Sequence, residues 1–317
     1  MVSVASVVAL AALCAATANA ATFTACPTAP TTAGDRRKTK TQLKFSTFNA
    51  EFLFLTGFGS LDCPGADCKW TTAAEAQSHI KQVATVLYEL DADIIQMNEV
   101  EDCTALNAVI TQLAALGDST YKPYLVKGTD TATGQNAALL TRVDPIGVSK
   151  HFYTTFNVSG FSKPITLVGA HLLANPENKA RCYEREAQAT VLASLANDAV
   201  SAGYHAIISG DLNDWSSTVP DKNSNEPISA VLDILTGSSF VQVASKATQT
   251  NRYSQWYDED DDCVYESTEL SSLDHILVSN SLSSSVSTVS FNHDLYTASC
   301  SGYNSDHYPI SIIIKAV

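Results

Sequence analysis

Basic residues are scarce in this sequence. It contains 19 Lys and Arg against 33 Asp and Glu, which gives a formal net charge of -14, and only 16% of its residues are charged. A protein this acidic has no basic field that could hold nucleic acid or an anionic membrane through the release of counterions. If its substrate is a phosphate polymer, a metal ion must supply the positive charge locally.

Long apolar runs are absent beyond the N-terminus. Residues 2–16 are almost wholly small and apolar, and Ala18-Asn19-Ala20 fits a small-x-small cleavage site. The run is too short for a membrane-spanning helix, and no later stretch of about 18 apolar residues exists. We therefore expect a signal peptide over residues 1–20, a secreted, extracellular product and no stable membrane association. We also expect a monomer.

Zinc-binding pairs are missing as well, because no CxxC or HxxxH partner accompanies Cys63 and Cys68. Cys14 lies in the predicted signal peptide, which leaves seven of the eight cysteines. In an oxidising compartment most of these should pair, and since seven is odd, at least one is free or pairs outside the chain. We expect a local disulfide between Cys63 and Cys68, and a bridge between Cys263 and Cys300.

Apolar residues are plentiful, at 45%, which is enough for a substantial core. Strand and helix patterns alternate without a repeat or a dividing linker, so we predict one α/β domain over 43–317 after a leader over 21–42. Strands are expected from Leu43 onward and over 94–97, 121–126, 136–141, 165–172, 205–210, 273–279, 286–292 and 308–314, with helices over 72–90, 103–116, 180–201 and 228–236. We expect two packed sheets with helices outside. The leader carries a basic patch that we expect to be a solvated lead-in or a processing site: Arg36, Arg37, Lys38 and Lys40.

Polar groups follow the apolar strands at five places. These are Asn49-Ala50-Glu51, Asn98-Glu99-Val100-Glu101, Gly169-Ala170-His171, Gly210-Asp211-Leu212-Asn213-Asp214 and Ser305-Asp306-His307. Any one of them alone could be a turn or a helix cap, and a lone histidine on an apolar strand is often a core residue. Five together are hard to explain as turns, because strand ends in α/β proteins feed the loops that carry functional sites.

The residue types at these strand ends indicate phosphoester hydrolysis. Carboxylate and amide oxygens are the hard ligands that suit Mg²⁺ or Ca²⁺. Such oxygens come from Asn49, Glu99, Asp211, Asn213 and Asp306. Two histidines beside them can move protons or bind a phosphate oxygen. The combination predicts hydrolysis assisted by an oxygen-ligated metal.

The ordered motifs resemble the endonuclease/exonuclease/phosphatase family of DNase I-like enzymes. They are FNAEF (48–52), QMNEVE (96–101), GAHL (169–172), GDLND (210–214), SLDHILVS (272–279) and SDHYPI (305–310). The resemblance covers residues 43–317 and implies a four-layer α/β sandwich, with two mixed sheets face to face and helices outside.

The resemblance also implies roles for individual residues. Glu99 matches the metal-binding Glu, with Asn49 and Asp306 beside it, and the metal would be Mg²⁺ or else Ca²⁺ or Mn²⁺. His307 matches the catalytic His. Asp274 matches the Asp that orients this imidazole, since a carboxylate fixes the tautomer of its partner and raises its basicity.

Further matches surround this pair. Asp211 and Asn213 match the residues that position the attacking water and the phosphate, and His171 matches a second His that contacts the scissile phosphate. Arg181 and Arg185 open the helix after His171, where either one could reach a phosphate or form a surface salt bridge.

Other candidates are expected to be structural. His275 should point to the face of its strand opposite Asp274, so we exclude it together with His79 and His205. The Tyr253–Trp256 segment is expected to pack in the core. Asp258–Asp262 is expected to be a solvated acidic loop, since it lacks the Gly turn and terminal Glu of a calcium loop.

The sequence leaves the substrate open. Export favours a secreted nuclease that acts on DNA or RNA as a transient partner. A secreted sphingomyelinase-like phospholipase C is the alternative, and it would need an exposed apolar element, for which Phe52–Phe58 is the candidate although a buried strand explains it better. A catalytically inert binding protein with the same fold is the third possibility.

Overall fold

A computed structural model describes residues 23–56, 70–130, 133–149, 152–260, 262, 264–295 and 305–317. The predicted signal peptide and the two expected cysteine bridges, Cys63 to Cys68 and Cys263 to Cys300, lie outside the described residues. In the described part, no helix is long and apolar enough to cross a membrane.

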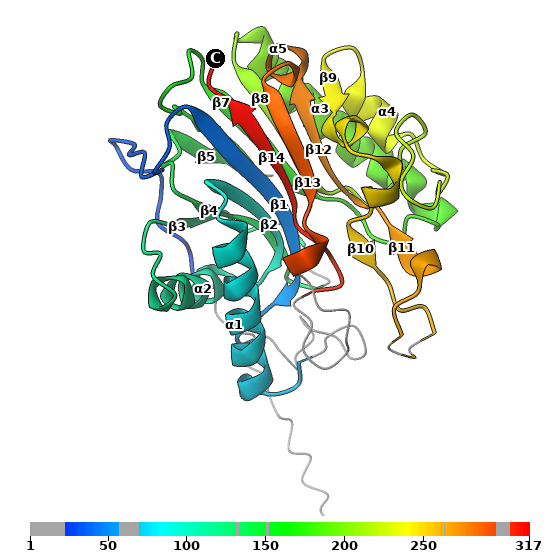
Figure 1. The fold of residues 1–317 in the computed structure, drawn as a ribbon, viewed down its shortest axis with the longest axis horizontal. Coiled ribbons are helices and arrows are strands. Elements are labelled where there is room, and N and C mark those ends of the chain that lie inside the picture. The colour runs from blue at the N-terminus through cyan, green and yellow to red at the C-terminus, as the bar shows by residue number, and fades with distance from the viewer. Residues whose placement is uncertain are drawn as a thin grey trace, which may run out of the picture.

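Two six-stranded mixed sheets face each other, and helices cover their outer faces (Figure 1). The first sheet has the order β13(Val286–Phe291), β14(Ile310–Lys315), β1(Gln42–Leu53), β2(Ile94–Val100), β4(Asn136–Thr141) and β3(Lys122–Leu125). The second has the order β5(Gly147–Ser149), β6(Tyr153–Phe156), β7(Ile165–His171), β8(His205–Asp211), β12(Asp274–Ser279) and β9(Phe240–Gln242). A short hairpin-like pair, β10(Gln255–Trp256) and β11(Leu270–Ser271), stands beside them. The predicted four-layer sandwich is confirmed.

The helices pack on the sheets through apolar faces. Helices α1(Ala73–Leu90) and α2(Cys103–Ala115) bury their apolar residues against the outer face of the first sheet. Helix α3(Cys182–Ser201) and the short α4(Val231–Thr236) do the same on the second, and α5(Asn280–Ser283) follows β12. Thr72 and Glu75 form a capping box that begins α1, and Asp91 ends it in the left-handed conformation.

The core between the sheets follows the two-residue period of the strands. Leu43 and Phe45 of β1, Leu167 of β7, Ile207 of β8 and Ile276 of β12 all lie in this inner layer. Because side chains alternate along a strand, each of these residues fixes which later residues face inward. Polar residues follow the apolar ones on this inner face at one end of the two sheets. At this end β1, β2, β7 and β8 finish, and β12 and β14 begin.

The leader is packed onto the domain, so the expected solvated basic patch is wrong for its two arginines. Arg37 is 3% exposed and pairs with Asp35 at 2.7 Å, while Arg36 pairs with Asp144 at 2.8 Å. A disulfide joins Cys26 of the leader to Cys103 of α2.

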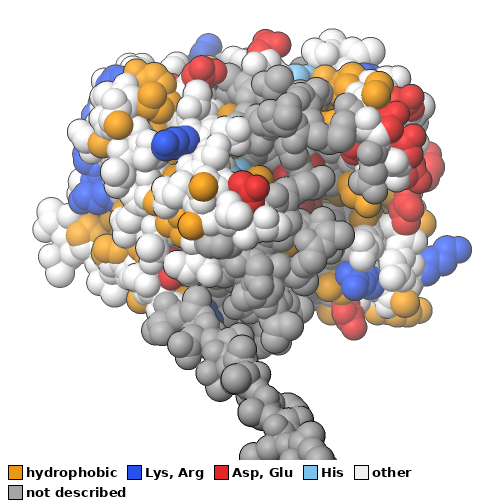
Figure 2. All heavy atoms as spheres, turned by 90° about the horizontal axis from the view of Figure 1, so that it is seen from below, with side chains coloured by type: hydrophobic (Ala, Val, Ile, Leu, Met, Phe, Trp, Pro, Cys, Tyr) orange, Lys and Arg blue, Asp and Glu red, His pale blue; other side chains and the backbone are white. Residues whose placement is uncertain are grey.

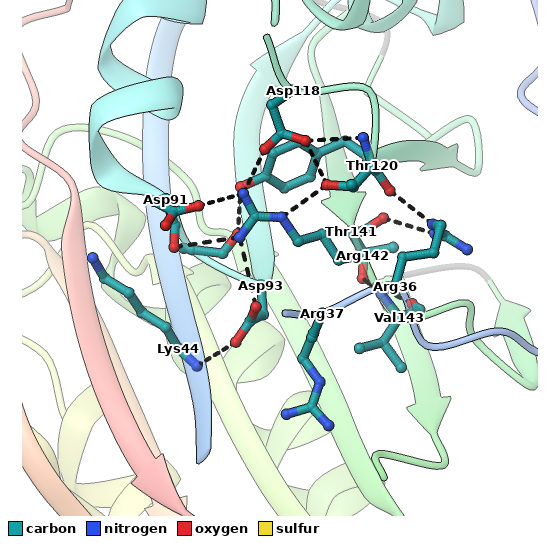
Figure 3. A network of polar contacts seen from close by, with 12 residues as sticks. Arg36, Arg37, Lys44, Asp91, Asp93, Asp118, Thr120, Thr141, Arg142 and Val143 are labelled. Carbon is teal, nitrogen blue, oxygen red and sulfur yellow. Dashed lines mark hydrogen bonds and ion pairs between the residues drawn. The ribbon is translucent and has the colours of Figure 1, made fainter. Parts of the chain in front are cut away.

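A buried polar network closes the end of the first sheet where β1 and β2 begin (Figure 3). The guanidinium of Arg142 contacts Asp118 and Asp91, and Asp93 lies 3.6 Å from it. The ring of Tyr121 stacks under Arg142 with its centroid 4.5 Å from Cζ. Asp93 also accepts a hydrogen bond from the backbone N–H of Lys44.

Candidate active site

The inward-facing polar residues come together where the strands end. Continuing the alternation of the inner core, Asn49, His171, Asp211 and Asp274 fall on the inner faces of β1, β7, β8 and β12. Strand pairing sets Asp211 directly opposite both His171 and Asp274. The four side chains thus meet between the sheets because of register and not because of any local motif.

Gly210 makes this register possible. A Cβ atom built on Gly210 would lie 1.8 Å from the carbonyl oxygen of Ala170 on the neighbouring strand, and its φ of +137° is one that other residues rarely adopt. The close approach brings the ends of β7 and β8 together, so that His171 Nε2 lies 3.6 Å from Oδ2 of Asp211.

A buried dyad joins the two sheets. His307, in the loop before β14, donates from Nδ1 to Oδ2 of Asp274 at 2.6 Å. Its Nε2 then points into the cluster, 3.7 Å from Asp211 Oδ2 and 3.7 Å from Asp306 Oδ1. Burial by itself would lower the pKa of His307, but the charges of Asp274 and Asp306 and the hydrogen bond to Asp274 raise it well above its ordinary value.

A second group of carboxylates lies beside the dyad. Glu99 accepts hydrogen bonds from Asn49 Nδ2 at 2.9 Å and from Gln135 Nε2 at 2.7 Å, and His171 Nε2 lies 3.7 Å from it. Asn49 Nδ2 also donates to Asp211 at 3.1 Å. Burial raises the pKa of both Glu99 and Asp211, which indicates that their negative charges are poorly compensated by the protein alone.

These residues fit a hard divalent cation. Carboxylate oxygens of Glu99 and Asp211 lie close enough to His171 for one ion to touch all three, and Asp211, Asp274 and His307 form a second such group. Among the described residues that line the adjoining cavity, none is Lys or Arg. An oxygen-ligated cation would compensate the negative charge of carboxylates clustered in this way.

The structure brings all three predicted metal residues to the cluster, with different orientations. Glu99 and Asp306 offer carboxylate oxygens to the shared space. Asn49 turns its NH₂ group toward Glu99 and Asp211, and its Oδ1 accepts from the backbone N–H of Glu51. In this orientation Asn49 holds the two carboxylates together and presents no oxygen to a metal.

Asn213 also lines the cavity, but its side chain is held from behind. Its Nδ2 donates to the carbonyl of Leu172 at 3.0 Å, and its backbone N–H donates to Asp211 Oδ1 at 3.0 Å. Asn213 and Glu99 have φ values of +47° and +61°. Such left-handed residues, where no glycine is present, are uncommon and concentrate at functional sites.

The two predicted arginines are not at the cluster, and neither lines the cavity. Arg185 is fully buried and donates to the carbonyls of Asn175 and Pro176, both at 2.9 Å. Arg181 donates to the carbonyl of Ala174 at 3.0 Å. Both guanidinium groups therefore hold the loop after β7, and the fully buried guanidinium of Arg185 cannot reach a phosphate.

The excluded residues lie where they were expected. His275 lies on the face of β12 opposite Asp274, and its Nε2 lies 2.9 Å from the carbonyl oxygen of Asp214. His79 is stacked on Trp70, and His205 contacts Ser281 at the far end of β8. Trp256 is 3% exposed, in agreement with the expected core packing.

Several residues that support the site were not predicted. Ser254 Oγ accepts from the backbone N–H of Asp274 at 2.9 Å. Ser305 donates to the carbonyl of Asn49 at 2.8 Å and accepts from the N–H of His307. Glu51 accepts from the N–H of Asp306. Only Ser305 and Glu51 stand inside the motifs, while Ser254 and Gln135 become visible only through the fold.

Solved structures of similar shape place the fold in a known class. An AP endonuclease from Archaeoglobus fulgidus matches with a TM-score of 0.60 and 17% identity, covering 87% of this chain and 100% of that one. Truncated TDP2 from Caenorhabditis elegans matches at 0.55 and 15%, covering 87% and 98%. An endonuclease/exonuclease/phosphatase from Beutenbergia cavernae matches at 0.55 and 15%, covering 87% and 72%. No protein-family model and no curated protein matches the sequence. The chain has the DNase I-like fold that the motifs predicted.

Proposed function

We propose that this chain, with its DNase I-like fold, is a secreted metal-dependent phosphodiesterase that hydrolyses nucleic acid. The observation that carries the proposal is the His307–Asp274 dyad, in which His307 Nε2 faces the buried carboxylate of Asp211 and the partly exposed carboxylate of Asp306. Water attack on a phosphodiester requires a proton acceptor, groups that position the water and the phosphate, and a site for a cation. The cluster contains all of these components.

The residues divide the work as follows. His307 takes a proton at Nε2 from a water held by Asp211 and Asn213, while Asp274 keeps the imidazole in the tautomer that leaves Nε2 free. The water oxygen forms a bond to phosphorus, the bond to the leaving oxygen breaks, and that oxygen takes up a proton. His171 donates a hydrogen bond to a non-bridging oxygen or helps to protonate the leaving group.

Glu99 and Asp306 would hold the metal, with Asp211 beside them, and Asn49 and Gln135 would keep Glu99 in place. When bound, a divalent ion such as Mg²⁺ supplies positive charge to the phosphoryl and leaving oxygens. This agrees with a cavity that contains no Lys or Arg among its described lining residues.

Two observations support the remaining parts of the proposal. The disulfide between Cys26 and Cys103 supports export, because disulfides persist in oxidising compartments. Phe52 and Phe54 are 8% and 0% exposed, so this part of the apolar segment packs inward and favours a nuclease over a lipid-binding phospholipase.

The test uses the mature protein with plasmid DNA, RNA and sphingomyelin liposomes, each with Mg²⁺ and with EDTA. We expect hydrolysis of nucleic acid that requires Mg²⁺ and that is lost in His307→Ala. Hydrolysis of sphingomyelin alone would establish the phospholipase instead. If none of the substrates is turned over, the protein is a binding protein and the proposal is wrong.

A further inference from the structure

A cavity of about 460 Å³ opens beside the catalytic cluster. The lining includes Asn175 and Glu177 from the loop after β7, and Tyr257 and Glu259 from the segment after β10. Its volume lies in the range of sites that enclose a small molecule or a single end group.

The outer walls of this cavity are acidic. Glu177 and Glu259 are exposed carboxylates from these two segments, and no described lining residue is Lys or Arg. Asp258, Asp260 and Asp262, which flank Glu259 in the sequence, place further carboxylates close together. Figure 2 looks onto this end of the molecule and shows acidic side chains gathered on the right, the side on which Figure 1 places β10 and β11.

The same walls offer groups that suit an uncharged partner. The ring of Tyr257 is 61% exposed at the cavity, where a flat base could stack on it. The side-chain amide of Asn175 makes no hydrogen bond to other described residues and can donate and accept. Arg185 holds this loop from below through the carbonyl of Asn175.

A nucleic acid strand that continues through the cavity would place a second phosphate charge beside these acidic walls. Neighbouring phosphates of one strand are separated by a single nucleoside, so when the cavity takes up the nucleoside beside the scissile phosphate, the next phosphate of a continuing strand lies at the walls of the cavity. There it would meet Glu177 and Glu259, with no Lys or Arg among the described lining residues to offset either charge. Like charges placed together disfavour such a complex.

We propose that the cavity accepts one terminal, uncharged nucleoside next to the scissile phosphate, so that the enzyme cleaves at the ends of single strands. Tyr257 and Asn175 bind the nucleoside, and Glu177 and Glu259 exclude a strand that continues past it. The proposal rests on the nuclease function proposed above and names the form of its substrate.

The test compares a linear single-stranded DNA with a covalently closed circle of the same sequence, in Mg²⁺. Methyl p-nitrophenyl phosphate, which carries one charge and no nucleoside, reports on the catalytic centre alone. We expect the linear strand to be degraded more than about tenfold faster than the circle, with release of single nucleotides. Tyr257→Ala should raise KM for the linear strand by a larger factor than it raises KM for the small diester.

The carboxylates are tested by their neutral isosteres. The double variant Glu177→Gln, Glu259→Gln should cleave the circle at least about threefold faster than the parent protein, with an unchanged rate on the small diester. The matched control is Glu89→Gln, Glu184→Gln, which removes two exposed carboxylates on α1 and α3, outside the cavity, and should change neither rate.

The two proposals fail in different ways. If neither the small diester nor any nucleic acid is hydrolysed, the proposed function is wrong. If the small diester is hydrolysed and the circle is cut as fast as the linear strand, the function stands and the end-binding cavity is wrong. An unchanged ratio of circle to linear cleavage in the Gln variants would also contradict the role of the two carboxylates.

Discussion

Nδ1 of His307 lies 2.6 Å from Oδ2 of Asp274, although one residue precedes a strand of the first sheet and the other begins a strand of the second. The proposed catalytic dyad is therefore also a contact between the two sheets. Its geometry depends on the packing of Ile276 and Ile310 in the layer between them. The geometry of the proposed catalytic pair is therefore coupled to the packing of the two sheets.

The dyad should act as a unit. We expect His307→Ala and Asp274→Asn each to lower kcat by several orders of magnitude, because either change removes the oriented proton acceptor. The double variant should lose little more than the worse single variant, since residues that act together are strongly non-additive. Steady-state kinetics on one diester substrate would measure this. Losses that multiply in the double variant would mean that the two residues act independently.

Glu99 should be essential for the metal and dispensable for the fold. The substitution Glu99→Gln keeps the shape of a side chain that accepts from Asn49 and Gln135 but removes the charge that compensates a cation. We expect no detectable divalent binding by calorimetry, loss of hydrolysis and an unchanged circular dichroism spectrum. Turnover near the parent level in Mg²⁺ would show that the metal assignment is wrong.

The strands that carry the site could be predicted because their alternation is long and regular. In β8, Ile207, Ser209 and Asp211 share one face of the strand. Because Ile207 is apolar and faces the core, the alternation predicts that Asp211 faces the same way. The motifs then indicated the roles that we propose for these residues. Five strands escaped prediction, since β5, β6, β9, β10 and β11 have only two to four residues and show no usable period.

Contacts between distant segments could not be predicted. Cys26 and Cys103 are 77 residues apart, and the pairing of cysteines cannot be deduced from the local sequence around them. Arg37 was expected to be solvated because its local sequence shows no partner for it. One of its hydrogen-bond partners is the carbonyl of Ser159, which is distant in the sequence. Gln135 reaches Glu99 only because β4 pairs with β2, so no signal near Gln135 marks it as part of the site.

Arg142 should stabilise the fold without affecting catalysis. Arg142→Met leaves Asp118 and Asp93 without their cation in the network of Figure 3, and removing one partner of a buried ion pair costs about 3–5 kcal/mol. Urea unfolding would measure the loss. Activity per folded molecule should be unchanged, because the network lies at the opposite end of the strands. The control Lys179→Met, at an exposed residue, should be neutral, and an equal loss there would contradict the argument.

His79 should make stability depend on pH. Its Nε2 lies 2.8 Å from the carbonyl oxygen of Ala50, its Nδ1 has no hydrogen-bond partner among the described residues, and its ring is stacked on Trp70. Burial lowers the pKa of His79 to about 4 in the folded protein, although hydrogen bonds to the backbone oppose the shift. In the unfolded chain the pKa returns to about 6.5.

The unfolded state therefore binds more protons than the folded state between these two values, so the free energy of unfolding falls as the pH drops from about 6.5 to about 4. The full contribution of His79, about 3 kcal/mol, is present above this window and is lost below it. His79→Gln, whose amide can still donate to Ala50, has no titrating group there. We expect the difference in urea unfolding free energy between pH 7.5 and pH 4.5 to be smaller in His79→Gln than in the parent protein. Equal differences would show that His79 is already charged in the folded state or that its titration is unchanged by folding.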